Sequence, residues 1–216
     1  MWMVKVLKKD NQKLEAKTTN QQKYLDAIKK HDVILCEGPS GSGKSFCAIG
    51  YAIERLIEKR ISKIIIAKPL LEAEKNIGAM PGDLRNKTEY YYGSLMHTVK
   101  EFIGHEQLEK RLQDKSIEFL PISFWRGYTF SNSVIIIDEA QNLLLSQFKL
   151  AITRIGYKSK IIFCGDTEQS DLKYDEPIYK KCIGKIREVE GVCAIKLEYE
   201  DIVRHSIISK ILSKLA

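Results

Sequence analysis

The chain has 216 residues, of which 44% are hydrophobic and 29% are charged, and its formal net charge is +7. This composition is typical of one globular domain, and no apolar run reaches the roughly eighteen residues that a membrane span needs. The first residues lack a secretory signal, and the five cysteines are odd in number with no C-x-x-C spacing. We therefore expect a cytoplasmic protein with reduced thiols and no membrane contact, whose basic charge suits a polyanionic partner.

The N-terminal part is expected to hold a short helix. Residues 1–17 are lysine-rich and show no visible chemistry; they are expected to form an irregular lead-in or an edge strand at 3–7. From Thr18, the stretch TTNQQKYLDAI combines capping residues with apolar positions at helical spacing, which predicts an amphipathic helix. Gln21 lies at its start. Its amide could exchange hydrogen bonds with adenine, or it could be a solvated glutamine at a helix start.

The strongest signal is the glycine-rich stretch that follows the apolar run at 33–36. GPSGSGKS fits the pattern G-x-x-x-x-G-K-[ST], in which glycines let backbone N–H groups turn toward phosphate oxygens. Lys44 would meet the β- and γ-phosphates, Ser45 would bind Mg²⁺, and the helix expected at 46–59 would direct its dipole at the anion. The predicted nucleotide-binding residues are Gly38, Pro39, Ser40, Gly41, Ser42, Gly43, Lys44 and Ser45.

A buried strand is expected at 63–67. We interpret the residues that follow it, about 68–132, as an insert in the domain. A helix is expected at 88–103, a polar helix at 106–115, and a short strand at 117–122. The three adjacent tyrosines Tyr90, Tyr91 and Tyr92 could stack bases, although aromatics at helical spacing also form cores. A loop, FWRGYTF, then carries Arg126 between aromatic residues.

The stretch SVIIIDEAQN is the second strong signal in the sequence. Four β-branched residues predict a buried strand, and two carboxylates follow at its carboxyl end, where ligands bind in open parallel sheets. Asp138 would hold Mg²⁺, and Glu139 would orient and deprotonate the attacking water. The alternative is a pair of solvated acids at a helix N-terminus.

The C-terminal third repeats the alternation of helix and strand. A helix at 143–155 is expected to end at Gly156, and a strand at 160–164 leads into GDTEQSDL. Gln169 in that stretch could bond the γ-phosphate or the attacking water. Another helix is expected at 177–189, a strand at 192–197 and a terminal helix at 202–214.

This order predicts a three-layer α/β domain, a RecA-like P-loop NTPase with a mainly parallel central sheet, over residues 18–216. From Thr18 onward the chain resembles the PhoH-like family, which is similar to the first motor domain of superfamily-one helicases. The resemblance rests on TTNQ, GPSGSGKS, KP with GAMPGDL, RGYTF, VIIIDEAQN, TRIG, GDTEQSDL and DIVRH, in that order. The family usually has Thr at position 45 and Arg at position 68, where this chain has Ser45 and Lys68.

The resemblance implies an ATPase that uses ATP and Mg²⁺ and acts in nucleic-acid metabolism, chiefly that of RNA. A nucleotide-gated regulatory module without turnover and a small-molecule P-loop kinase are the alternatives. Glu139 beside the metal-binding Asp138 favours hydrolysis, because a kinase must exclude water. For RNA or single-stranded nucleic acid we expect phosphate contacts from Lys87, Lys100 and Arg126, with stacking by some of the three tyrosines.

Phosphoryl transfer at such sites is helped by an arginine that reaches the γ-phosphate from across the cleft. The resemblance of YEDIVRH to the end of the first helicase motor domain makes Arg204 the candidate, acting on a neighbouring subunit. This predicts a head-to-tail homo-oligomer, possibly a hexameric ring. Arg126 and Arg154 are alternative arginines, and local pairing of Arg204 with Glu200 or Asp201 is the alternative role.

Overall fold

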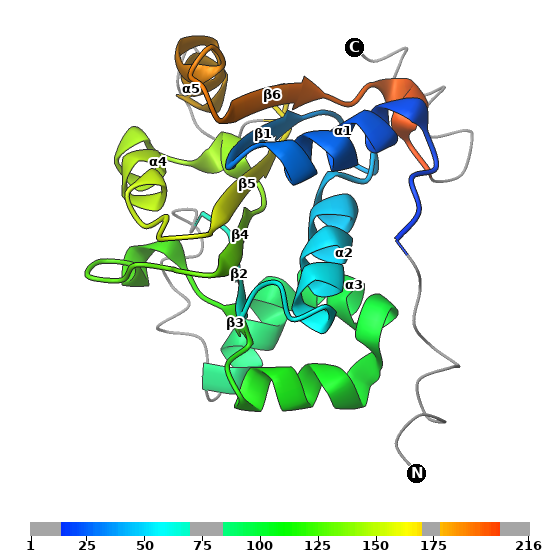
Figure 1. The fold of residues 1–216 in the computed structure, drawn as a ribbon, viewed down its shortest axis with the longest axis vertical. Helices are drawn as coiled ribbons and strands as arrows, with labels where there is room; N and C mark the ends of the chain where they lie inside the picture. Colours follow the sequence, from blue (N-terminus) through cyan, green and yellow to red (C-terminus); the bar gives the residue numbers. More distant parts are fainter. Residues whose placement is uncertain (1–13, 70–83, 170–177, 204–216) are drawn as a thin grey trace.

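The computed structural model describes residues 14–69, 84–169 and 178–203, with the backbone alone for 84–90. Its centre is a six-stranded sheet in the order β3-β2-β4-β5-β1-β6, and every neighbouring pair of strands is parallel (Figure 1). The strands are β1 (Val33–Glu37), β2 (Lys63–Ala67), β3 (Ile117–Phe119), β4 (Ser133–Ile137), β5 (Lys160–Gly165) and β6 (Val192–Lys196). Parallel pairing places all their carboxyl ends at one edge of the sheet.

Helices cover both faces of this sheet. One face packs against α1 (Thr19–Lys30), α2 (Lys44–Ile57) and α3 (Leu84–Gln113), and the other against α4 (Leu145–Ile152) and α5 (Ile178–Ile186). The central strands are apolar on both sides because each side faces helices, and all five residues of β4 are buried. The predicted three-layer α/β architecture is confirmed.

The start of α1 is tied to the far end of the described chain. The Thr18 hydroxyl accepts a hydrogen bond from the Gln21 N–H at 3.1 Å, so it caps the helix. Thr18 also donates to the buried carboxylate of Asp201, and the Asn20 amide donates to the same carboxylate at 3.0 Å. Asp201 therefore ties down the start of α1, although Asp201 and Thr18 are 183 positions apart in the chain.

Two helices differ from their predicted bounds. α2 begins at Lys44, two positions before the predicted start, because Gly43, at φ 92°, turns the chain directly into the helix. α3 begins at Leu84, before the predicted start at 88, and it consists of two helices joined across a kink at Gly104, whose backbone is not helical (φ 77°, ψ 167°), so the predicted break between the helices at 88–103 and 106–115 is confirmed. Among the helices that the structure describes, none has the length and apolarity that crossing a membrane requires.

The segment 117–156 contains two wrong predictions. β3 ends at Phe119, and a 3-10 turn, Ile122–Phe124, follows it, so the strand is shorter than expected. α4 ends at Ile152, and Gly156 is not its cap. Instead the Gly156 N–H donates to the Phe130 carbonyl at 2.8 Å, and a Cβ on this glycine would lie 2.7 Å from that oxygen. Gly156 is needed for close approach of two backbones.

The other C-terminal elements lie close to their predicted places. α5 (Ile178–Ile186) and β6 (Val192–Lys196) fall within the ranges expected at 177–189 and 192–197. The terminal helix expected at 202–214 does not begin at Ile202, whose backbone is extended. The rest of that helix and the strand expected at 3–7 lie outside the described residues.

Candidate active site

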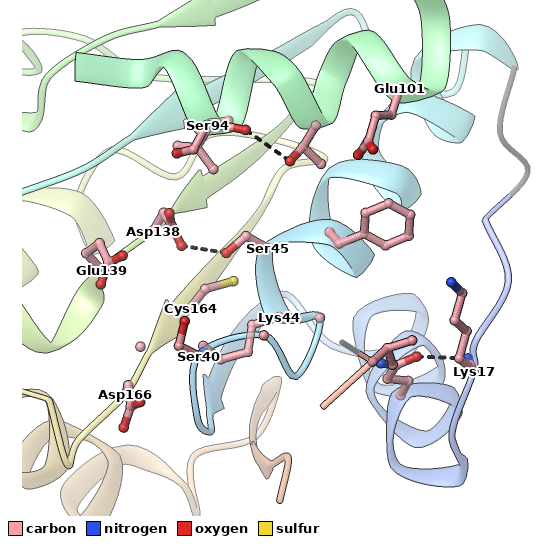
Figure 2. Close-up of a pocket in the computed structure, with 18 of the residues that line it drawn as sticks. Lys17, Ser40, Lys44, Ser45, Ser94, Glu101, Asp138, Glu139, Cys164 and Asp166 are labelled. Atoms are coloured by element: carbon pink, nitrogen blue, oxygen red, sulfur yellow. Dashed lines mark hydrogen bonds between the residues drawn. The ribbon is translucent and has the colours of Figure 1, made fainter. Parts of the chain in front are cut away.

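The glycine-rich loop joins β1 to α2 at the carboxyl edge of the sheet (Figure 2). Gly41 and Gly43 adopt φ 85° and 92°, a region that favours glycine. A Cβ on Gly43 would lie 2.8 Å from the side-chain nitrogen of Gln21, and one on Gly38 would lie 2.6 Å from the Leu197 carbonyl. The loop is therefore packed from behind, while its other side and the N-terminus of α2 line a pocket that suits an anion.

Lys44, the first residue of α2, is folded back over the loop. Its ammonium group donates to the carbonyl oxygens of Gly38, at 2.6 Å, and Pro39, at 2.9 Å. These two neutral acceptors hold the positive charge at the rim of the loop. A phosphate group is a stronger acceptor than a peptide carbonyl, so it would draw the ammonium away from them.

Ser45 and Asp138 lie together at the bottom of the pocket. The Ser45 hydroxyl donates to Asp138 Oδ1 at 2.5 Å, and Lys68 Nζ is 3.9 Å from Oδ2. Burial raises the pKa of Asp138, as does the nearby carboxylate of Glu139, while the hydrogen bond from Ser45 opposes the shift. A hydroxyl and a carboxylate are hard oxygen donors of the kind that Mg²⁺ binds together with phosphates. The donor pair thus fits the metal that the sequence predicts.

Glu139 begins the turn that follows β4. It adopts a left-handed conformation, φ 55° and ψ 40°, which is uncommon for a residue with a side chain and marks a constrained position. Its carboxylate accepts a hydrogen bond from Gln141 Nε2 at 2.7 Å. The Gln141 side chain is buried, and its Oε1 accepts the Asp166 N–H at 2.9 Å. Sequence reasoning missed this role of Gln141, although the residue lies in the DEAQ stretch.

Two residues of the stretch after β5 line the same pocket. Asp166 is buried, and burial raises its pKa. One of its carboxylate oxygens accepts the Glu168 N–H at 3.1 Å, and the other has no hydrogen-bond partner within the described part of the chain. Gln169 is exposed at the pocket mouth, and its predicted contact with the γ-phosphate or water stays a prediction.

Gln21 lies behind the loop, with 3% of its surface exposed. Its Nε2 donates to the Ser42 carbonyl at 2.9 Å, and its Oε1 accepts the Lys17 N–H at 2.8 Å. Both ends of the amide are thus bonded to backbone in this structure. The prediction that Gln21 reads adenine stays a prediction, and the structure adds a second role, support of the loop.

The whole pocket has a volume of about 550 Å³. The loop and the carboxylates line one part, and α3 contributes Thr98 together with Ser94 and Glu101, which Figure 2 labels. Cys164 also lines the pocket. Burial raises the pKa of its thiol to about 12, so the thiol stays neutral. Throughout the ranges that the structure describes, no cluster of three His, Cys, Asp or Glu side chains could hold a metal by itself.

Of the residues predicted to bind nucleic acid, the structure describes the side chains of Tyr91, Tyr92, Lys100 and Arg126. Tyr92 is 2% exposed and packs against Phe119, so its predicted stacking on a base is wrong. The Tyr91 hydroxyl donates to the Pro69 carbonyl at 2.6 Å. Lys100 is half-buried on α3, whereas Arg126 is exposed on the loop after β3. Arg204 and the side chains of Lys87 and Tyr90 lie outside the described residues.

A phosphate-binding loop after the first strand, a carboxylate pair after β4 and a parallel sheet between helices define a RecA-like P-loop nucleoside triphosphatase fold. A solved structure of similar fold is the large terminase from a thermophilic bacteriophage, with a TM-score of 0.59 and 14% identity over 91% of this chain and 49% of that chain. The same terminase has been solved in complex with ADP, with a TM-score of 0.56, 15% identity and the same coverage. These likenesses concern the fold.

The chain belongs to the PhoH-like protein family, whose model matches residues 13–216. It is 37% identical to the PhoH-like protein of Synechocystis sp. over 92% of this chain and 61% of that protein. It is 34% identical to the PhoH-like protein of Bacillus subtilis over 92% of this chain and 63% of the relative. The chain therefore spans about three fifths of the length of these relatives. The family predicted from the motifs is confirmed.

Proposed function

We propose that this protein is an Mg²⁺-dependent ATP hydrolase whose turnover is coupled to binding of RNA or single-stranded nucleic acid. The observation that carries the hydrolase assignment is the braced carboxylate of Glu139, held by Gln141 beside the Ser45–Asp138 pair. A carboxylate next to the metal-binding pair serves to activate water, which a small-molecule kinase must exclude.

In this proposal each residue of the site has a separate role in ATP hydrolysis. Lys44 would exchange the carbonyls of Gly38 and Pro39 for the β- and γ-phosphates, and the loop N–H groups would bind the phosphate oxygens. Ser45 and Asp138 would hold Mg²⁺, which neutralises phosphate charge when it is bound. Glu139 would orient the attacking water and take its proton.

A nucleotide-gated module without turnover is the main competing function. Such a module needs the phosphate loop but has no use for a general base. In this chain Glu139 is kept in a left-handed backbone conformation, and its carboxylate is bonded to a buried amide. This constraint favours hydrolysis.

The coupling to nucleic acid and the oligomeric state rest on less direct support. A net charge of +7 suits a polyanion, and the motifs resemble those of helicase motor domains. We propose that the protein assembles head to tail, as a ring of subunits, so that an arginine of one subunit completes the site of the next. Arg204 is the first candidate, and Arg126 and Arg154 are the others.

The deciding experiment measures ATP turnover with and without Mg²⁺, in the absence of nucleic acid and with RNA, single-stranded DNA or duplex DNA. Lys44→Ala should abolish nucleotide binding or turnover. Glu139→Gln should still bind ATP but trap it unhydrolysed, because the base is lost while the phosphate contacts remain. Hydrolysis by Glu139→Gln at the parental rate would show that the assigned chemistry is wrong.

A further inference from the structure

The face of the molecule beside α4 exposes three large aromatic rings. Phe124, Tyr128 and Tyr157 are 64%, 51% and 75% exposed, although residues of this kind usually bury most of their surface. They come from two segments, the loop 124–131 before β4 and the turn 153–159 between α4 and β5. Together with Arg126, Arg154 and Lys158 on the same segments, they form what we call the aromatic-basic strip.

Backbone hydrogen bonds hold the two segments side by side. The Phe130 N–H donates to the Arg154 carbonyl at 2.9 Å, and the Gly156 N–H donates to the Phe130 carbonyl at 2.8 Å. The Arg154 guanidinium donates to the Tyr128 carbonyl at 3.0 Å. Figure 1 shows the loop before β4 projecting beside α4. The residues of the strip are thus carried by two segments that are fixed to each other.

The two segments that carry the strip contain charges of one sign. The printed sequence contains no Asp or Glu from Phe119 to Ile137 or from Leu143 to Lys160. Within the described part of the chain, Arg126, Arg154 and Lys158 form no ion pair. Lys158 Nζ lies 5.3 Å from the centre of the Tyr157 ring, and Arg126 is two residues from both Phe124 and Tyr128 along the chain. Each exposed ring therefore has a cation close to it in space or in sequence.

Flat apolar rings alternating with unpaired cations match a polymer that is both anionic and rich in exposed ring faces. A single strand of nucleic acid has these properties, because its unpaired bases offer π-faces and its backbone offers phosphates. A duplex keeps its base faces stacked. We propose that the aromatic-basic strip is the stacking platform for a single strand of nucleic acid, an inference that rests on the nucleic-acid coupling proposed above.

The strip is anchored in the core on the α4 and α5 face of the sheet. Trp125, between Phe124 and Arg126, is completely buried, and its indole N–H donates to the Leu120 carbonyl at 3.1 Å. It belongs to the same core cluster as Ala140 and Leu143, which follow Glu139 in the chain. In this proposal the strip has the stacking role that the sequence analysis gave to some of Tyr90, Tyr91 and Tyr92.

The test is fluorescence anisotropy of a labelled twelve-residue oligouridylate or oligothymidylate, titrated at several salt concentrations. The triple variant Phe124→Leu, Tyr128→Leu, Tyr157→Leu removes the rings and keeps apolar bulk. We expect it to bind the single strand about tenfold more weakly or worse, since stacking contributes about 1–3 kcal/mol per base. Its basal ATP turnover and melting temperature should equal those of the parent.

A second pair of variants tests the phosphate contacts. Lys158→Gln should lower the salt slope of binding by about 0.7, the contribution of one phosphate contact in a single strand. The matched control, Lys30→Gln, removes the same charge from the exposed end of α1 and should leave the slope unchanged. Tyr157→Leu alone, at the most exposed ring, provides the stacking test if the triple variant does not fold.

The outcomes separate the two proposals. If the parent binds the single strand and the triple variant binds it equally well, the strip is refuted and the proposed function stands. If the parent hydrolyses ATP but binds no single strand, the coupling and the strip both fail. If the triple variant changes the oligomeric state and not the affinity for nucleic acid, the surface is a protein interface and the inference is overturned.

Discussion

The side chain of Gln141 fixes the carboxylate of Glu139 at 2.7 Å, and it does so from a buried position. Its other end accepts the backbone N–H of Asp166, the residue that follows β5. One amide thus sets the orientation of the candidate base relative to two neighbouring strands, β4 and β5. The amide is a positioning group, because it contacts the Glu139 carboxylate and does not line the pocket.

Gln141→Ala should lower kcat by about 10²-fold while the affinity for ATP stays within about twofold of the parent, because misplacing a catalytic group by about 1 Å has this effect. Stopped-flow binding of a fluorescent ATP analogue and steady-state turnover check the split. Gln147→Ala is the matched control, because that side chain only caps α4 through the Leu144 N–H. A parallel loss of ATP affinity and kcat would mean that Gln141 supports the fold of the pocket instead.

Gln21→Ala tests the two roles of a residue whose amide bonds the phosphate loop. Nε2 donates to the Ser42 carbonyl, so its loss should loosen the loop. The affinities for ATP, GTP and inorganic tripolyphosphate should then fall by a similar factor. Isothermal titration with the three ligands measures this. Gln22→Ala is the control, because the Gln22 side chain bonds only the exposed Asp26. Loss confined to ATP would show instead that Gln21 reads adenine.

Asp138→Asn should raise the melting temperature of the metal-free protein at neutral pH. The pKa of Asp138 is raised by burial, so the folded state takes up a proton more readily than the unfolded state. Stability from this group is therefore fully present below the pKa of the unfolded chain and is lost as pH rises through the raised pKa of the folded state, and asparagine avoids that loss. Thermal denaturation across acidic to neutral pH measures the effect.

The same group sets the pH dependence of metal binding. Binding of Mg²⁺ needs the Asp138 carboxylate, so the affinity for Mg·ATP should fall as pH falls through the raised pKa. Mg·ATP should stabilise the parent but not Asp138→Asn. Asp26→Asn is the control on the exposed face of α1, where hydrogen bonds from Lys29 and Gln22 lower the pKa of the carboxyl. If Asp138→Asn melted below the parent in the absence of metal, the account of its burial would be wrong.

Gly156→Ala should lower the free energy of unfolding by about 1–3 kcal/mol, because the new Cβ would lie 2.7 Å from the Phe130 carbonyl oxygen and 2.4 Å from the Ser131 hydroxyl oxygen. Gly184→Ala is the matched control inside α5, where a Cβ meets no atom within 4 Å. There alanine should stabilise the helix by about 0.5–1 kcal/mol. Urea denaturation of both variants checks the signs, and equal effects would disprove the close approach at Gly156.

The arginine in trans can be tested by mixing subunits. Lys44→Ala subunits should not bind ATP but keep Arg204, and Arg204→Ala subunits should bind ATP but lack the arginine. If the proposed head-to-tail contact exists, ATP turnover should reappear when the two inactive proteins are mixed. Mixtures with Arg126→Ala or Arg154→Ala subunits test the alternatives. No recovery despite demonstrated subunit exchange, or full turnover by a monomeric Arg204→Ala protein, would exclude the role of Arg204.

The parts of the site that sequence predicted are those encoded by neighbouring residues. The loop around Lys44, and Asp138 and Glu139 at the end of β4, follow from short motifs and from the rule that carboxyl ends of parallel strands share an edge. The sequence offered both base stacking and core packing for Tyr92 and could not decide between them, because its burial depends on packing against Phe119 from another part of the chain.

The remaining features arise from contacts that span the fold. Gln141 bonds Asp166 across 25 positions, and the aromatic-basic strip unites two segments that the sequence separates by α4 and β4. Gly156 looked like a helix cap because the local pattern of helix and glycine is the same in both cases. Only the neighbouring backbone of Phe130 distinguishes a glycine required by close approach.

Asp201 fixes the segment that runs from β6 to the phosphate loop. Its carboxylate fastens the segment after β6 to Thr18 and Asn20, and two residues later the Val203 N–H donates to the Gly41 carbonyl at 3.3 Å. Val203 is thus bonded directly to the phosphate loop. A shift of Gly41 on phosphate binding would therefore move Val203 while Asp201 holds the preceding residues in place.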